Sequence, residues 1–214
     1  IIKLRNQTML KRKTIYLAIL NQGSIRAEMS ACLQEISRQD KYDLLITYPS
    51  DKPISYNRNK IVQDFLSRKD CDYLIMIDND IIPPPNILNL VDYDKDIITP
   101  VLFAYQQSQV IPLAVMRRKE DGFYTPIDPQ KQTGLIEVDG NGTGCMIIRR
   151  DVLEKVRAPF LNEYDADGMK TTGLDFAFCR RAKELGFSVW CHFGYICSHY
   201  TTVDLKQIYA SLIR

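Results

Sequence analysis

The sequence predicts an α/β fold in which a mostly parallel central sheet is flanked by helices on both faces. Segments of strand character alternate with segments of helical periodicity through the first half of the chain, which is typical of parallel sheets with crossover helices. Residues 73–77 form a continuous apolar run of the kind that lies buried on both faces. At 214 residues, with no internal repeat, the chain can bury roughly 70% of its unfolded surface in one domain.

The predicted elements follow from hydrophobic periodicity and from the positions of proline and glycine. In chain order they are a strand over 14–20, a helix over 25–38, a strand over 42–48, a helix that begins at Asn57, a strand over 73–77, a short helix over 86–91, a strand over 96–105, strands over 111–118 and 135–138, a helix over 176–185 and a strand over 189–191. The strands over 111–118 and 135–138 are expected to form a second, smaller sheet. We expect one domain, 1–214, with two halves, 1–105 and 106–214.

Charge and cysteine content narrow the classes of partner. The chain carries 28 basic and 26 acidic residues without a long basic cluster, so we expect no nucleic-acid partner. No apolar run approaches the roughly 18 residues that a membrane span requires, and residues 1–13 are too polar for a signal peptide. The six cysteines form no Cys-x-x-Cys pair and are expected to be reduced. These features favour a soluble cytoplasmic protein, either alone or fused to further domains.

Two aspartates follow the buried strand directly. Residues 70–80 read Asp-Cys-Asp-Tyr-Leu-Ile-Met-Ile-Asp-Asn-Asp, so Asp78 and Asp80 stand at the carboxyl end of the strand, where ligands bind in open α/β sheets. Mg²⁺ and Mn²⁺ prefer carboxylate and phosphate oxygens as ligands. The spacing fits a metal ion that bridges a diphosphate, although a polar turn capping a core strand has the same pattern.

Four further segments of the chain contain short sequence motifs. Residues 14–24 combine an apolar strand with the loop Asn-Gln-Gly-Ser, and residues 56–62 read Tyr-Asn-Arg-Asn-Lys-Ile-Val. Residues 138–150 contain Gly-Asn-Gly-Thr-Gly and end in Arg-Arg, and residues 173–182 read Gly-Leu-Asp-Phe-Ala-Phe-Cys-Arg-Arg-Ala. Together with the Asp-x-Asp strand, these segments resemble the GT-A glycosyltransferases, especially compact family-2-like members. The resemblance implies a Rossmann-like sheet with a nucleotide-sugar-binding half and an acceptor-side half.

The resemblance also implies roles for particular residues. Those that it places at the nucleotide-sugar donor are Ile19, Asn21, Asn57, Arg58, Asp78 and Asn79. It implies that Asp78, Asp80 and His199 hold Mn²⁺ or Mg²⁺, whereas His192 is expected to be structural. Arg58 suits a nucleotide because guanidinium forms paired hydrogen bonds to phosphate or to a base edge. A solvated residue at a helix start is the alternative for Arg58.

Asp175 is the candidate catalytic residue. An inverting transfer needs a carboxylate that takes the proton of the acceptor hydroxyl, and the resemblance places Asp175 there. The alternative is that Asp175 caps the helix over 176–185. Leu174 departs from the pattern, because the family usually carries Glu at this position. A retaining mechanism remains open.

The glycines at positions 140, 142 and 144 do not form a dinucleotide fingerprint. Such a fingerprint follows the first strand and opens a helix, whereas this cluster comes late and precedes a strand. We expect instead that these glycines leave room for a sugar near the backbone.

The function expected from these observations is metal-dependent transfer of a hexose or deoxyhexose. The donor is a nucleotide diphosphate sugar, with UDP expected, and the acceptor is a carbohydrate or glycan hydroxyl. Two alternatives remain open. A nucleotidyltransferase also uses paired carboxylates, although the loop over 21–24 is poor for a triphosphate. A noncatalytic sugar- or nucleotide-binding domain of a larger protein is the other.

Overall fold

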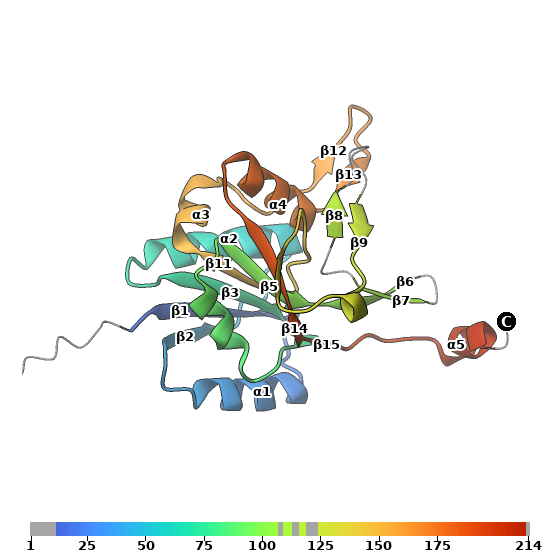
Figure 1. Ribbon diagram of the computed structural model, residues 1–214, viewed down its shortest axis with the longest axis horizontal. Coiled ribbons are helices and arrows are strands. Elements are labelled where there is room, and N and C mark those ends of the chain that lie inside the picture. The colour runs from blue at the N-terminus through green and yellow to red at the C-terminus, as the bar shows by residue number, and fades with distance from the viewer. Residues whose placement is uncertain (1–11, 107–108, 113–115, 119–123, 213–214) are drawn as a thin grey trace, which may run out of the picture.

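The computed structural model describes residues 12–106, 109–112, 116–118 and 124–212. Its centre is a seven-stranded sheet (Figure 1). In order across the sheet the strands are β10 (Leu135–Glu137), β14 (Val189–Ile196), β5 (Ile97–Val101), β11 (Cys145–Arg149), β3 (Tyr73–Asp78), β1 (Thr14–Leu20) and β2 (Asp43–Thr47). All except β10 and β11 point in the same direction, so the expected mostly parallel sheet is confirmed.

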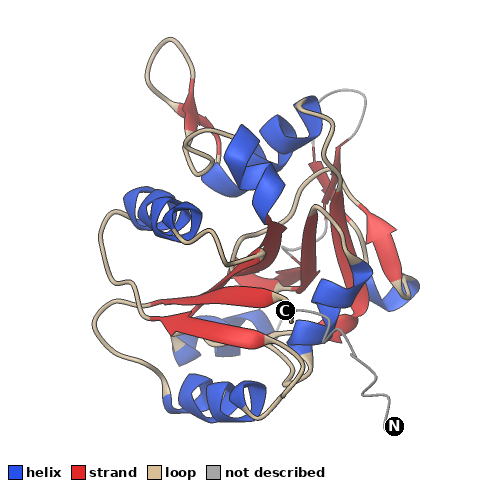
Figure 2. Cartoon of the chain, turned by 90° about the vertical axis from the view of Figure 1, so that its left-hand side faces the viewer, coloured by secondary structure: helices blue, strands red, loops and turns tan. Residues whose placement is uncertain are grey.

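Helices cover both faces of this sheet (Figures 1 and 2). The described helices are α1 (Ala27–Ser37), α2 (Ile54–Ser67), α3 (Arg150–Lys155) and α4 (Leu174–Glu184), with the 3-10 helices η1 (Ile87–Tyr93) and η2 (Pro129–Lys131), and α5 (Leu205–Leu212), which lies away from the sheet (Figure 1). The chain steps outward from β1 to β2 and then back across β1 to β3. Because parallel crossovers are right-handed, this reversal places α1 on one face and α2 on the other.

In the described part of the chain, four short two-stranded sheets lie outside the central one. They are β4 (Ile81–Ile82) with β15 (Ser198–His199), β6 (Phe103–Gln106) with β7 (Gln109–Pro112), β8 (Met116–Arg118) with β9 (Tyr124–Pro126), and β12 (Glu163–Tyr164) with β13 (Lys170–Thr172). The predicted strand over 111–118 corresponds to parts of β7 and β8, and residues 113–115 lie outside the described part. The expectation that 135–138 joins a smaller sheet is wrong, because β10 pairs with β14 at the edge of the central sheet.

The core is built on β3, as its apolar run predicts. Leu74, Ile75, Met76 and Ile77 are fully buried, because β1 and β11 flank the strand and helices cover both faces. The predicted apolar stripe of α1 is also confirmed, since its buried residues are Met29, Cys32, Leu33 and Ile36. All six cysteines are buried and free of disulfide bonds.

Several predicted elements differ from the structure in their bounds or their type, and three of the differences lie near the site. The helix expected from Asn57 begins at Ile54, because Pro53 precedes it with a backbone suited to a helix start and accepts a bond from the Asn57 N–H at 3.0 Å. The strand expected over 96–105 is divided at Leu102, where the chain leaves the central sheet and β6 pairs with β7. The short helix expected over 86–91 is the 3-10 helix η1.

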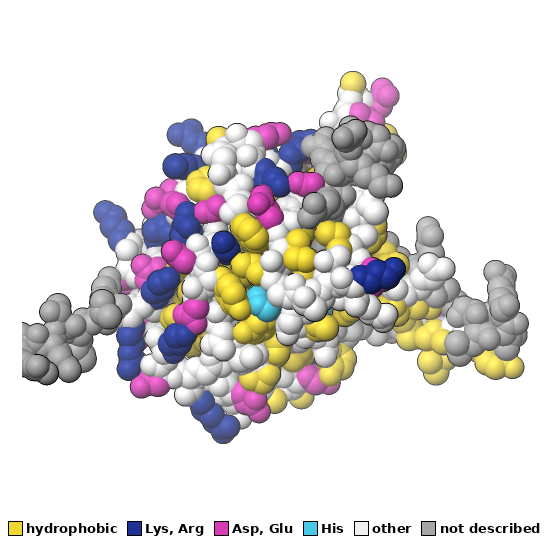
Figure 3. Space-filling view, in the orientation of Figure 1, with side chains coloured by type: hydrophobic (Ala, Val, Ile, Leu, Met, Phe, Trp, Pro, Cys, Tyr) yellow, Lys and Arg dark blue, Asp and Glu magenta, His cyan; other side chains and the backbone are white. Residues whose placement is uncertain are grey.

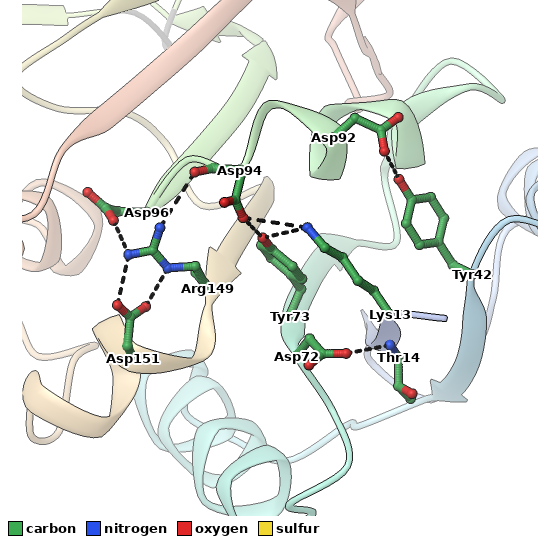
Figure 4. A network of polar contacts seen from close by, with 10 residues as sticks. All are labelled: Lys13, Thr14, Tyr42, Asp72, Tyr73, Asp92, Asp94, Asp96, Arg149 and Asp151. Atoms are coloured by element: carbon green, nitrogen blue, oxygen red, sulfur yellow. Dashed lines mark hydrogen bonds and ion pairs between the residues drawn. The ribbon is translucent and has the colours of Figure 1, made fainter. Parts of the chain in front are cut away.

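A polar network closes the edge of the sheet where β1, β3 and β5 begin (Figure 4). The Arg149 guanidinium lies 2.6 Å from Asp96 and 2.7 Å from Asp151. Tyr73 donates a hydrogen bond to Asp94, whose carboxylate also lies 3.5 Å from the Lys13 ammonium. The strand starts are therefore joined by paired charges.

The surface shows no dominant charge on the face seen in Figure 3, where basic and acidic side chains are interspersed. Among the described residues, no helix has the length and apolar character needed to cross a membrane.

Candidate active site

The Asp-x-Asp motif lies at the opposite edge of the sheet, where β3 ends. The backbone N–H of Asp78 donates to the Gly144 carbonyl and that of Asn79 to the Leu20 carbonyl, each at 2.9 Å. The motif is thus held between the end of β1 and the start of β11. Because α1 and α2 lie on opposite faces, this position is the switch point at which open α/β sheets bind ligands.

The buried Arg58 of α2 is bonded to the first acid of the motif. Its Nη2 donates to both carboxylate oxygens of Asp78, each at 2.9 Å, and its Nη1 donates to the Thr143 carbonyl at 3.3 Å. Burial is the main reason that the pKa of Asp78 is raised; the charge of Arg58 acts to lower this pKa, and the charges of Asp80 and Asp175 act to raise it. Arg58, which was expected at the nucleotide, is in this structure committed to Asp78.

Asp80 and His199 meet on the solvent side of the motif. Their Oδ2 and Nε2 atoms are 3.6 Å apart. The pairing of β15 with β4 produces this contact, and the Tyr200 N–H donates to the Asp80 carbonyl at 2.8 Å. The other ring nitrogen of His199 is hydrogen-bonded to the Phe103 carbonyl. Within the described residues, no three His, Cys, Asp or Glu side chains converge on a common point for a metal.

A hollow of about 850 Å³ opens beside the motif. Four of the residues expected at the donor line it: Asn21, Asn57, Asp78 and Asn79. Ile19 does not line this hollow, because its side chain is fully buried in the core on β1. The hollow is therefore formed by the loops that follow β1, β2 and β3.

Two asparagines fix one wall of this hollow, which is the larger of two at the site. The Asn21 amide donates to the Tyr48 carbonyl at 3.1 Å and to the Pro49 carbonyl at 3.3 Å, and its oxygen accepts the Gly23 N–H at 2.8 Å. The Asn57 amide also donates to the Pro49 carbonyl, at 3.4 Å. The loops after β1 and β2 are thus tied together, and the wall of the hollow exists before any ligand binds.

Asp175 lines a second hollow, of about 360 Å³. The alternative in which Asp175 caps α4 is wrong, because the cap is Gly173 and the helix begins at Leu174. The Asp175 side chain is instead fixed by the Thr143 hydroxyl, which donates to its Oδ1 at 2.6 Å. Leu174, where the family pattern carries Glu, lines the same hollow and is mostly buried.

The two hollows adjoin, and the fully buried Thr143 connects their acids. Ile54 lines both hollows, while Asp78 lines the larger and Arg58 the smaller. Thr143 accepts a bond from Arg58 through its carbonyl and donates one to Asp175 through its hydroxyl. Sequence reasoning did not single out Thr143, because nothing in the spacing of its glycine-rich segment shows that it faces α4.

The glycines near Thr143 make room for the protein's own side chains. A Cβ atom at Gly140 would lie 2.4 Å from the Phe176 ring, and one at Gly144 would lie 3.1 Å from Ile81. The expectation that this segment leaves room for a sugar is therefore wrong for these two positions. Their small size lets the segment that precedes β11 pack closely against Phe176 of α4 and Ile81 of β4.

Comparison with known proteins bears on the fold. No protein-family model matches the chain, and no curated protein matches its sequence. The chain is similar to the crystal structure of A197 from STIV, with 20% identity and a TM-score of 0.59 over 89% of this chain and 86% of that one. This similarity supports the mixed α/β fold.

Two weaker similarities are to proteins of different activities. One is a glycosyltransferase involved in the glycosylation of the major capsid of PBCV-1, with 13% identity, a TM-score of 0.37 and coverage of 66% of this chain and 62% of that one. The other is the inositol-1-phosphate CTP transferase from T. maritima, with 9% identity, a TM-score of 0.47 and coverage of 92% and 94%. With TM-scores below 0.5, neither supports a conclusion about activity, which has to come from the site.

Proposed function

We propose that this protein is a glycosyltransferase that moves a hexose or deoxyhexose from a nucleoside-diphosphate sugar, with UDP as the expected nucleotide, to a hydroxyl of a carbohydrate. The observation that carries the proposal is the arrangement of two adjoining hollows around the pair of Asp78 and Arg58. The larger hollow takes the donor and the smaller one takes the acceptor. Because Ile54 lines both, the bound sugars meet beside it.

The larger hollow suits a nucleotide sugar in size and position. Its volume of about 850 Å³ lies within the range of small-molecule sites, roughly 300–1,000 Å³. It opens at the switch point of the sheet, with Asn21 on one wall and Asp80 on another. Asp78, oriented by Arg58, presents a carboxylate to the hydroxyl groups of the donor.

Asp175 is the proposed base. Thr143 holds one carboxylate oxygen, and the other accepts the proton of the acceptor hydroxyl. The freed hydroxyl oxygen attacks the anomeric carbon while the bond to the diphosphate breaks on the opposite side. The proton ends on Asp175, the electron pair of the broken bond ends on the diphosphate, and the configuration of the sugar is inverted.

The residues on the solvent side of the motif fit a divalent cation in part. Asp80 and His199 supply an oxygen and a nitrogen 3.6 Å apart, a separation that two ligands of one cation can adopt after a small adjustment. Asp78 fits less well, because both of its oxygens accept bonds from Arg58. Asp80 and His199 would therefore hold Mn²⁺ or Mg²⁺ together with donor phosphate oxygens. A bound cation supplies positive charge that offsets the charge developing on the leaving diphosphate.

The test is a transfer assay with purified protein. UDP-sugars and GDP-sugars are offered with carbohydrate acceptors in the presence of Mn²⁺, and release of the nucleoside diphosphate is measured alongside the product and its anomeric configuration. We expect acceptor-dependent release that EDTA reduces. Release of pyrophosphate from a nucleoside triphosphate and a sugar phosphate would replace the proposal with nucleotidyl transfer. Nucleotide binding without turnover of any pair would indicate a noncatalytic domain.

A further inference from the structure

Arg26 lies at the entrance to α1 and lines the larger hollow. Its backbone N–H donates to the Asn79 side-chain oxygen at 2.9 Å. This bond holds the backbone of Arg26 against Asn79, the middle residue of the Asp-x-Asp motif. The position of Arg26 is therefore fixed relative to Asp78 and Asp80, although Arg26 lies in the connection between β1 and α1 and the motif lies at the end of β3.

The Arg26 guanidinium is held on the Asp80 side of the hollow. Its central carbon lies 4.5 Å from the centroid of the Tyr200 ring, and Tyr200 in turn donates its N–H to the Asp80 carbonyl at 2.8 Å. Stacking on an aromatic ring limits rotation of the guanidinium while leaving its outer N–H groups available. The stack therefore orients a cation beside Asp80.

The ion pairing of Arg26 leaves its charge mostly uncompensated. Its Nε lies 3.4 Å from the Glu28 carboxylate without a hydrogen bond among the described residues, and the two side chains are 38% and 41% exposed. A contact of this length and exposure contributes little. Arg58, by comparison, is 4% exposed and bonded to both oxygens of Asp78. Of these two arginines, Arg26 is the one able to take a new anionic partner.

An anionic ligand in the larger hollow needs a cationic side chain, because acidic side chains also line this hollow. Its acids are Asp51, Asp78 and Asp80, and its only cations among the described residues are Arg26 and Lys52. Asp51 is paired with Lys60 at 2.9 Å and Asp78 with Arg58, while Asp80 lies 3.6 Å from His199, so in the absence of a bound cation the charge of Asp80 repels a diphosphate. Lys52 lies on an exposed loop, whereas the backbone N–H of Arg26 is bonded to Asn79 of the motif itself.

We propose that Arg26 binds the diphosphate of the nucleotide donor, an inference that rests on the proposed function and extends it. The guanidinium donates paired hydrogen bonds to phosphate oxygens while its face stays on Tyr200. Because this positive charge is part of the chain, the site retains affinity for a nucleoside diphosphate when no divalent cation is bound. The same contact persists as the diphosphate leaves the sugar, so Arg26 also stabilises the leaving group.

The test is calorimetric titration in EDTA. UDP, uridine, GDP and guanosine are titrated into the wild-type protein and into Arg26→Ala, Arg26→Lys and Lys52→Ala. We expect Arg26→Ala to weaken binding of the favoured diphosphate by about 10- to 100-fold, because hydrogen bonds between charged groups are stronger than those between neutral groups. Binding of the matching nucleoside should change by less than about twofold, because it lacks phosphates. Arg26→Lys should retain part of the affinity, and Lys52→Ala should have the smaller effect.

The outcomes separate the two proposals. Equal affinity of the wild-type protein and Arg26→Ala for the diphosphate would overturn the role of Arg26 and leave the proposed function standing. An equal loss for diphosphate and nucleoside would show that Arg26 shapes the hollow and does not bind phosphate, which also overturns the inference. Failure of the wild-type protein to bind any of these ligands, with or without Mn²⁺, would overturn the proposed function itself. Urea unfolding of each variant shows whether its fold is intact.

Discussion

The two edges of the seven-stranded sheet use charged side chains in opposite ways. Where β1, β3 and β5 begin, acids are paired with cations or phenol groups, as for Arg149 with Asp96 and Asp151 (Figure 4). Where β1 and β3 end, the charges of Asp80 and Asp175 act on Asp78, which alone of the three is bonded to the buried Arg58, and two hollows open beside them. The first edge stabilises the fold, whereas the second holds like charges close together, as a binding site requires.

The pKa values of the acids show the same contrast. At the first edge, the hydrogen bond from Tyr73 lowers the pKa of Asp94, and the hydrogen bonds from Arg149 lower that of Asp151. At the second edge, burial raises the pKa of Asp78 despite its contact with Arg58. Acids whose ionised form is favoured by the fold and an acid whose ionised form is disfavoured by burial therefore stand at opposite ends of the same strands. Such separation is expected where function opposes stability.

The largest expected effect is the loss of transfer in Asp175→Asn. If Asp175 is the base, the rate falls by about 10²- to 10⁴-fold, because the amide cannot take the proton. Affinity for the donor should be unchanged, since Asp175 lines only the smaller hollow. Initial rates and donor titration provide the measurement. The matched control is Asp151→Asn at the other edge, which should lower stability and leave transfer intact. An active Asp175→Asn enzyme would remove the base from the mechanism.

The next largest effect is a difference in unfolding free energy between variants of the two acids of the motif. Asp78→Asn leaves Arg58 buried without its counter-ion and should cost about 3 kcal/mol of unfolding free energy. Asp80→Asn, at a side chain that is 50% exposed, should change it by less than about 0.5 kcal/mol. Urea unfolding of both variants tests this difference. The double variant Asp78→Asn with Arg58→Met should lose less than the sum of the single variants. Equal stability of the two single variants would contradict the structural role of Asp78.

A smaller effect is expected at Thr143, which positions the base. Thr143→Val removes the hydroxyl that donates to Asp175 and should lower the transfer rate by about tenfold, the equivalent of about 1.4 kcal/mol. Thr143→Ser keeps the hydroxyl and should restore most of the rate. The acceptor KM in both variants shows whether the loss lies in binding or in the chemical step. A Thr143→Val rate equal to wild type would exclude this positioning role.

The smallest effect concerns the pH dependence of stability at the other edge. A lowered folded-state pKa means that Asp94 contributes stability above the unfolded pKa of about 3.9, and that the contribution is lost as pH falls through the folded pKa. Asp94→Asn should therefore cost less than about 1 kcal/mol at pH 7, because the side chain is 66% exposed, and the difference should shrink below about pH 4. Asn tolerates the left-handed backbone of this position, where φ is 49°.

That last comparison is made by urea unfolding of the wild-type protein and Asp94→Asn between pH 3 and pH 7. A difference that grows as the pH falls would contradict the sign given for Asp94. Repeating the series with Asp80→Asn, at the opposite edge, shows whether the pH dependence belongs to the paired edge.

The sequence by itself determined the order of the main strands and helices and the position of the Asp-x-Asp motif at a strand end. Hydrophobic periodicity is a local property, so β1, α1, β2 and β3 could be placed from runs such as residues 73–77. The same local signal failed at Leu102 and at residues 135–138. Which strand pairs with these segments depends on parts of the chain that are distant in sequence; β10, for example, pairs with β14.

Only the tertiary structure decided which polar groups of the site meet. Arg58 and Asp78 are separated by 20 positions, Asp80 and His199 come from opposite halves of the chain, and Thr143 reaches Asp175 across the start of β11. Spacing in the sequence cannot show that Arg58 is buried against Asp78 while Arg26 faces the larger hollow. The physical reason is that side-chain pairing follows from sheet order and helix packing, which bring together residues that share no local pattern.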